Sequence, residues 1–402
     1  MFTKNFMTFT GFPQKFLVLA LPLLLFPGGL LTAEEKPNTL TTSEVQNGWI
    51  LLFDGETDYG WRAASKANWE VKDGTITVSS GDQGLFYTTS QFANYILKVD
   101  FEADPETNSG IFLRTSPKPR NLGEDTYELN IAPNNNPFPT GGFVAQKKAD
   151  SISPKSGWNT FEVWAVWGRF QVFLNSEKVL EFTDPNPIGR GYIGLQHNSG
   201  RVAFRNIKLK PMEGKRIFNG TDLTGWEIFS ENESEWSVTE EGYLHVENGP
   251  GQLETTETFG DFILQMDVLT KGKHLNSGVF FRSIPGERWN GYESQIHNGY
   301  EDGDRTKPLD YGTGGFYRRQ PARKVVADDF EWFTTTLVVT DNRMATWVNG
   351  IQVNDWGDNR DRDENPRRGR RDEAGTLILQ GHDPTTNILF KELKVYPVPP
   401  RR

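Results

Sequence analysis

The chain contains the same series of short motifs twice, and this internal repeat constrains its fold more than any other feature. The spacing between the copies changes from motif to motif and is largest toward the C-terminus, as expected when loops are inserted between common strands. We therefore predict two tandem domains, module one at residues 45–211 and module two at residues 213–399. The paired motifs are Phe53-Asp-Gly55 with Phe218-Asn-Gly220, Asn108-Ser-Gly-Ile-Phe-Leu-Arg114 with Asn276-Ser-Gly-Val-Phe-Phe-Arg282, Tyr127-Glu-Leu-Asn-Ile131 with Tyr292-Glu-Ser-Gln-Ile296, and Thr140-Gly-Gly-Phe143 with Thr313-Gly-Gly-Phe316.

Within each module, apolar residues alternate with polar ones at a period of two, which indicates strands. Residues 94–102 and 169–174 show this pattern in module one, and residues 262–268 show it in module two. Asn349-Gly350, between two such segments, is typical of a tight hairpin. Many short strands joined by turns predict an all-β protein made of two antiparallel sandwiches or jelly rolls.

Charge and composition exclude several classes of function. The chain has 43 Lys and Arg against 53 Asp and Glu, a formal net charge of −10, which argues against a nucleic-acid partner. It contains no cysteine, so disulfides, thiolate metal sites and cysteine nucleophiles are excluded.

The N-terminus has the pattern of a secretory signal peptide. Lys4 and Lys15 precede an apolar run at residues 16–26, and the small residue Ala33 comes before a polar start. The run is too short to span a bilayer, and no later segment approaches that length. We therefore expect a signal peptide at residues 1–33, no membrane span in the mature chain, and a periplasmic or secreted location.

Module two concentrates polar side chains on one face of a predicted strand. In the segment from Tyr292, alternation places Glu293, Gln295 and His297 on the same side. Such a face suits the concave surface of a sheet that binds a polyhydroxylated ligand, although a solvated edge strand would show the same pattern. The matching face of module one carries Glu128 and, in place of the histidine, Ala132.

Other residues near strand ends are candidates for the same site. Arg282 either pairs with Glu293 or offers its guanidinium to a ligand, and Arg114 with Glu128 would repeat either arrangement. Trp289, in a loop without a counterpart in module one, is the better candidate for stacking on a sugar. The remaining candidates close a strand in each module: Gln380 and His382 in module two, and Gln196 and His197 in module one.

Together these motifs resemble the 3-keto-disaccharide hydrolase family, and the resemblance covers both modules. It implies a concanavalin-like jelly roll and a hydrolase that acts on glycosides whose ring carbon 3 is a ketone, and the signal-peptide pattern adds that this hydrolase is exported. Module one departs from the pattern at Ala132-Pro133, where module two has His297-Asn298 and where family members commonly place an acidic residue.

For a 3-keto-glycoside, a base would remove the C2 proton, an acid would assist departure of the aglycone, and water would then add. The catalytic candidates are Glu293, His297, His382 and Arg282. A divalent metal held by Glu293, His297 and His382 is an alternative to protein hydrogen-bond donors, and no cofactor is certain. Because Ala132 can neither transfer a proton nor bind a metal, we expect module two to be catalytic. The substrate-binding candidates are Gln295, Gln380, Trp289, Arg114, Glu128, Gln196 and His197.

Two other functions are compatible with these residues. The same fold supports a lectin-like envelope protein that binds carbohydrate without cleaving it, and it also supports a purely structural protein. Clustered titratable groups favour the enzyme, with a carbohydrate as its partner.

Overall fold

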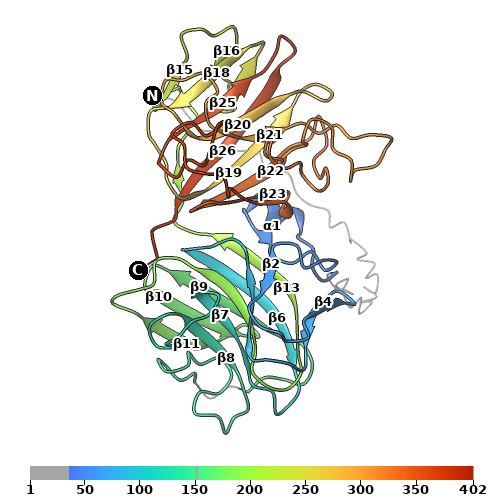
Figure 1. Ribbon diagram of the computed structural model, residues 1–402, viewed down its shortest axis with the longest axis vertical. Coiled ribbons are helices and arrows are strands. Elements are labelled where there is room, and N and C mark those ends of the chain that lie inside the picture. The colour runs from blue at the N-terminus through green and yellow to red at the C-terminus, as the bar shows by residue number, and fades with distance from the viewer. Residues whose placement is uncertain (1–35, 151–152, 402) are drawn as a thin grey trace, which may run out of the picture. The chain divides into compact units, whose positions relative to one another are not determined.

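The computed structural model describes residues 36–150 and 153–401 (Figure 1). The predicted signal peptide at residues 1–33 lies outside this part. Among the described residues the only helix is α1 (Thr42–Gln46), which begins with a capping box between Thr41 and Glu44. No helix in the described part is both long and apolar enough to cross a membrane.

Module one is a sandwich of two antiparallel sheets, one of eight strands and one of five. The larger sheet has the order β11 (Glu177–Thr183), β10 (Arg169–Leu174), β9 (Asn159–Val166), β6 (Tyr95–Ala103), β13 (Val202–Pro211), β4 (Thr75–Val78) and β3 (Glu70–Lys72), with β1 (Ile50–Leu51) paired to β13. The smaller sheet has the order β2 (Trp61–Ala63), β5 (Gly84–Thr88), β12 (Tyr192–His197), β7 (Ser109–Thr115) and β8 (Tyr127–Ile131).

Module two repeats both sheets with the same strand order. Its larger sheet runs β16 (Glu235–Val238), β17 (Leu244–Glu247), β26 (Asn387–Pro397), β19 (Phe262–Thr270), β22 (Phe333–Thr340), β23 (Arg343–Val348) and β24 (Ile351–Gly357), with β14 (Lys215–Arg216) paired to β26. Its smaller sheet runs β15 (Trp226–Ile228), β18 (Gly251–Thr255), β25 (Thr376–Gly381), β20 (Ser277–Ser283) and β21 (Tyr292–Ile296). The prediction of an all-β chain with two antiparallel sandwiches is confirmed.

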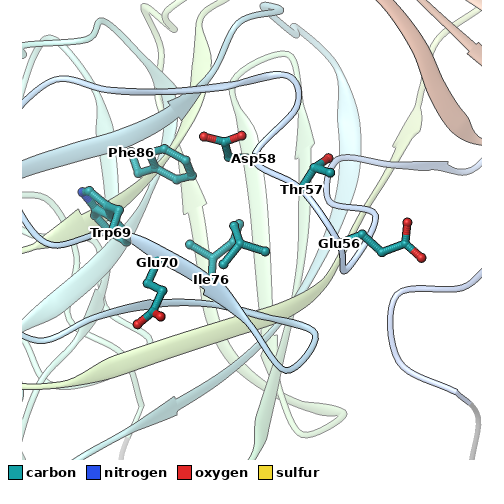
Figure 2. Close-up of a pocket in the computed structure, with 8 residues that line it drawn as sticks. Glu56, Thr57, Asp58, Trp69, Glu70, Ile76 and Phe86 are labelled. Carbon is teal, nitrogen blue, oxygen red and sulfur yellow. The ribbon is translucent and has the colours of Figure 1, made fainter. Parts of the chain in front are cut away.

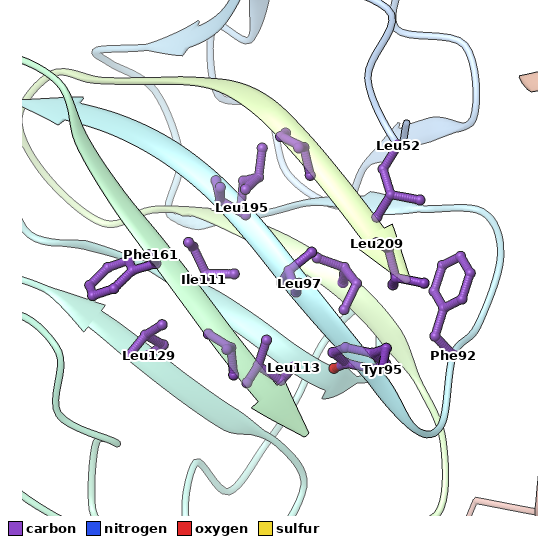
Figure 3. Close-up of a cluster of buried hydrophobic side chains, with 14 of the residues drawn as sticks. Leu52, Phe92, Tyr95, Leu97, Ile111, Leu113, Leu129, Phe161, Leu195 and Leu209 are labelled. Carbon is purple, nitrogen blue, oxygen red and sulfur yellow. The ribbon is translucent and has the colours of Figure 1, made fainter. Parts of the chain in front are cut away.

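The core of each module fills the space between its two sheets. In module one, Leu97 and Phe161 of the larger sheet face Ile111 and Leu195 of the smaller one, and all four are buried (Figure 3). A fully buried side chain of this size stabilises the fold by roughly 1.5–3 kcal/mol relative to an exposed one. Because every second residue points inward, the alternate residues of the smaller sheet are free to form a polar outer face.

The two cores are less separate than the repeat predicts. Trp347 and Val338, on the larger sheet of module two, belong to the buried cluster of module one. The Trp347 indole donates a hydrogen bond to the carbonyl of Leu51, 2.8 Å away. The outer face of the larger sheet of module two packs on module one, which explains why this face carries apolar side chains.

Candidate functional site

The outer face of the smaller sheet in module two is polar. Val279 and Leu379 point into the core, so their neighbours in sequence on β20 and β25 point outward. The outward residues include Glu293 and Gln295 on β21 and Gln380 on β25. These three were predicted to share a face or a pocket, and the structure places all three beside one pocket.

This pocket has a volume of about 190 Å³. It also receives Trp289, from the loop before β21, and His382, which directly follows β25. A second pocket of about 230 Å³ shares five lining residues with the first, among them Glu293. Glu293 therefore lies at the junction of the two pockets. The residues that line the first pocket are Asn276, Phe280, Trp289, Glu293, Gln295, Tyr317, Arg318, Arg367, Gln380 and His382.

Glu293 is held in surroundings that favour its neutral form. A Cβ added at Gly278 would lie 2.7 Å from Glu293 Oε1, so the carboxyl packs directly over the glycine. Burial raises the pKa of Glu293 to about 8; Asp310 acts in the same direction, whereas Arg367 and Arg318 oppose it. Glu293 consequently carries a proton near neutral pH, which is the form that a general acid requires.

His382 has the contacts of a general base. Its Nδ1 lies 3.1 Å from Asp383 Oδ2, and its Nε2 lies 3.4 Å from the side-chain nitrogen of Asn276. The carboxylate needs a donor and the amide nitrogen is a donor, so both neighbours select the tautomer with the proton on Nδ1. The Nε2 lone pair then accepts from Asn276, which lines the same pocket. The Trp289 ring stacks parallel to the imidazole, with ring centres 6.2 Å apart and planes at 5°.

Several residues of this site were not among the sequence candidates, and Asn276 and Asp310 are two of them. Asp310 Oδ2 accepts hydrogen bonds from the side chains of Asn276, at 2.8 Å, and Gln295, at 2.9 Å. Asn276 begins the repeated Asn-Ser-Gly motif, so its recurrence was a signal that could have identified it. Asp310 lies in a segment without a counterpart in module one, and no sequence pattern marked it.

Arg282 does not belong to the pocket, which corrects its assignment as a catalytic residue. Its φ of +47° and the register shift between Phe280 and Ser283 show a β-bulge that turns the side chain away from Glu293. The guanidinium is fully buried, lies 2.6 Å from Asp261 Oδ1 and donates to the carbonyl of Asp341. Its role is therefore structural.

His297 is also displaced from the predicted site. Strand β21 ends at Ile296, so the alternation that places Glu293 and Gln295 does not extend to His297. Its Nδ1 accepts a hydrogen bond from the backbone N–H of Gly299, and its ring faces that of His274, with centres 6.0 Å apart. Burial lowers the pKa of His297, an effect that Asp310 opposes. His297 does not line the pocket that holds Glu293 and His382.

The corresponding face of module one keeps the carboxyl but not the pocket. Glu128 is buried, and burial raises its pKa to about 7, with Gln196 opposing the shift. Among the described residues its Oε2 has no hydrogen-bond partner. His197 follows Gln196 directly and so points to the opposite face, with the core residue Leu195. His197 therefore does not join Glu128.

Arg114 is not a substrate-binding residue, because its guanidinium is buried and donates to the backbone carbonyls of Trp167, Ile188 and Ala165. Like Arg282, it sits at positive φ, +49°, in the equivalent strand. Arg114 and Arg282 therefore recur because both strands contain a bulge at this position, and not because both modules bind substrate there.

A larger pocket in module one, of about 310 Å³, lies away from Glu128. It is lined by Trp69, Phe86 and the acidic residues Glu56, Asp58 and Glu70. Figure 2 shows that the Glu56 and Glu70 carboxylates point away from each other on opposite sides of Ile76. These acids do not converge on a common point.

The set of Glu293, His297 and His382, considered above as ligands of a divalent metal, is not brought together. Within residues 36–401, apart from 151 and 152, no three His, Asp or Glu side chains form a group that could hold a metal ion.

The chain thus combines two antiparallel sandwiches with, in module two, a polar outer face whose pocket holds a carboxyl and an imidazole. Residues 48–210 and 213–396 both match the family described as a 3-keto-alpha-glucoside-1,2-lyase-like domain. The chain belongs to this family, in two tandem copies.

Similar proteins match one module's length of the chain. A 3-keto-disaccharide hydrolase of Bacteroides thetaiotaomicron is 22% identical over 231 residues, covering 42% of this chain and 79% of the relative. A solved glycosyl hydrolase candidate from Parabacteroides distasonis is 22% identical, covers 44% of this chain and 100% of its own, and has a TM-score of 0.39. The carbohydrate-binding module CBM66 of Bacillus subtilis is 16% identical, covers 44% of this chain and 98% of its own, and has a TM-score of 0.31.

Proposed function

We propose that module two cleaves glycosides whose ring carries a ketone at carbon 3, by elimination of the aglycone followed by hydration. The observation that carries the proposal is that a protonated carboxyl, Glu293, and an imidazole oriented by a carboxylate, His382, line one pocket. The family description names a 1,2-lyase of 3-keto-glucosides and the relative is named a 3-keto-disaccharide hydrolase, which supports this substrate class.

The chemistry assigns one role to each group. The C3 ketone acidifies the hydrogen on C2. His382 Nε2 exchanges its 3.4 Å contact with Asn276 for this hydrogen and removes it as a proton, leaving an enolate whose charge lies on the C3 oxygen. The enolate collapses, a C1–C2 double bond forms, and the C1–O bond to the aglycone breaks. Glu293 gives its proton to the departing oxygen. Water then adds across the double bond: the Glu293 carboxylate takes a proton from the water as its oxygen bonds to C1, and the His382 imidazolium returns its proton to C2, so that atoms balance and both groups recover their starting protonation states.

The amides of the pocket supply polar contacts for the sugar. Gln380 lines the pocket, and its Oε1 has no hydrogen-bond partner among the described residues. Asn276 donates to Asp310, and Gln295 donates to both, so this part of the wall is fixed before substrate arrives. Fixed dipoles can stabilise the enolate without a cost of reorganisation during the reaction.

The proposal also includes the place of the reaction. The signal-peptide pattern at residues 1–33 supports export, so the glycoside would be met in the periplasm or outside the cell.

The decisive experiment compares turnover of a 3-keto-disaccharide by the purified mature protein and by variants. Glu293→Gln and His382→Asn should each lower kcat by about 10²- to 10⁴-fold, because each removes a positioned proton-transfer group. Glu128→Gln, the matched change in module one, should leave kcat nearly unchanged. Wild-type activity should also fall as the pH rises through about 8, where Glu293 loses its proton.

Circular dichroism controls for folding, and the unoxidised parent disaccharide controls for the role of the ketone. Unchanged turnover in both module-two variants would contradict the proposal. Binding of the disaccharide without turnover by the wild type would favour the lectin-like alternative.

A further inference from the structure

The second pocket beside Glu293 is unusually rich in guanidinium groups. Arg319 lines only this pocket, Arg318 and Arg367 line both pockets, and among the described residues none of the three forms an ion pair with a carboxylate. Arg319 donates to the backbone carbonyl of Arg367 at 3.0 Å, and Arg367 Nε donates to the carbonyl of Trp289 at 3.1 Å. The only carboxyl that lines the pocket is Glu293.

Within the segment that contains Arg367, the other arginines do form ion pairs with carboxylates. The segment 357–374 contains six arginines, and Arg367 is the only one without an ion pair among the described residues. In a chain of net charge −10, acidic partners are not scarce. Unneutralised positive charge therefore collects at one wall of the site. The five ion pairs are Arg360–Asp358, Arg362–Asp372, Arg368–Asp363, Arg370–Asp372 and Arg371–Glu373.

The position of Glu293 decides which part of a substrate would meet this wall. The base His382 and the amides of Gln295 and Gln380 line only the first pocket, so the sugar ring that loses its C2 proton belongs there. The glycosidic oxygen joins the sugar ring to the leaving group, so the acid that protonates it must reach both. Glu293 meets this requirement because it lines both pockets. The second pocket is then the leaving-group subsite, and its apolar surface comes from Phe280, Phe316 and Tyr317.

We infer that this subsite accepts a leaving group that carries a carboxylate, held by Arg318 and Arg367 over an aromatic floor. Guanidinium groups match carboxylates in shape and charge, and such charge-assisted hydrogen bonds are about twice as strong as neutral ones. A bound anion would also offset the field of these arginines on Glu293, so the acid would keep its proton in the complex. The inference rests on the proposed function for the direction of binding.

The test measures binding of product-like ligands that cannot react, so its outcome does not depend on turnover. Isothermal titration compares 4-hydroxybenzoate with the neutral 4-hydroxybenzamide, and glucuronate with glucose. We expect at least one acid to bind about tenfold or more tightly than its neutral partner, with an affinity that falls as salt is added. The pair that discriminates identifies the carboxylate as that of an aromatic acid or of a uronic acid.

The variants locate the effect. Arg318→Gln combined with Arg367→Gln should abolish the preference for the acid, whereas Arg368→Gln, whose partner is Asp363, should preserve it. Glu293→Gln should also preserve it, even if turnover is lost, which separates this inference from the assignment of the acid. Equal affinity for acid and neutral ligand in the wild type would overturn the inference, as would a preference that survives in the double variant.

Discussion

At the scale of single residues, Glu293 and Glu128 show how one position can be used in two ways. Both follow a buried tyrosine on equivalent strands, and burial raises the pKa of both carboxyl groups. Glu293 lines two pockets that both contain Arg318 and Arg367, and the first of them also contains the His382 imidazole, whereas Glu128 lines none of the pockets described above. The neutral carboxyl of Glu293 can act on a ligand because it lines a pocket, whereas the buried carboxyl of Glu128 lines none of these pockets.

The shifted pKa of Glu293 predicts how its replacement changes stability with pH. The carboxyl titrates at about 8 when folded but near its ordinary value of 4.5 when unfolded, so between these values the folded state binds the extra proton. The free energy of unfolding therefore falls as pH rises through this window. Glu293→Gln removes the titration, so the variant should gain stability relative to the wild type from pH 4.5 to 8 and no further above it. Urea unfolding at a series of pH values measures the difference, and a difference independent of pH would contradict the shift.

At the scale of the strand, alternation predicted part of the site and failed where the strand is irregular. It placed Glu293 and Gln295 correctly because β21 is regular from Tyr292 to Ile296. It failed at His297 because the strand had ended. Arg282 was placed by its position near a strand end, and that placement failed because a bulge turns its side chain away from Glu293. Arg282 pairs with Asp261 only because the bulge redirects its side chain, and a strict two-residue alternation cannot predict where a bulge occurs.

The Gly278 position gives an element-scale prediction. Gly278 pairs with Gln295 in the β20–β21 ladder, and the Glu293 carboxyl lies over it. Gly278→Ala should leave the fold intact because its backbone angles suit alanine, but the new methyl must displace Glu293 and lower kcat by about tenfold or more. Gly260→Ala is the control, since its added Cβ would meet nothing nearer than 3.9 Å. Equal activity in both variants would show that the position of Glu293 is not critical.

At the scale of the whole molecule, the repeat predicted two sandwiches but not how they are joined. Arg190 of module one pairs with Asp261 and, at 2.7 Å, with Asp341 of module two. Asp261 is the same carboxylate that holds Arg282. One acidic residue therefore serves both the internal bulge of module two and the contact between modules. Sequence comparison of the two copies could not reveal this, because contacts between repeats have no internal counterpart.

This shared carboxylate predicts that two arginine substitutions are not additive. Arg190→Met and Arg282→Met each leave Asp261 with one guanidinium, but together they leave a largely buried charge with neither. The loss in free energy of unfolding should therefore exceed the sum of the single losses by about 0.5–3 kcal/mol, measured by urea unfolding. Arg190→Met combined with Arg360→Met is the matched control and should be additive, because Arg360 pairs with Asp358 instead. Additivity in the first pair would mean that Asp261 does not couple the bulge to the module contact, and the buried arginine of each module would then stabilise that module alone.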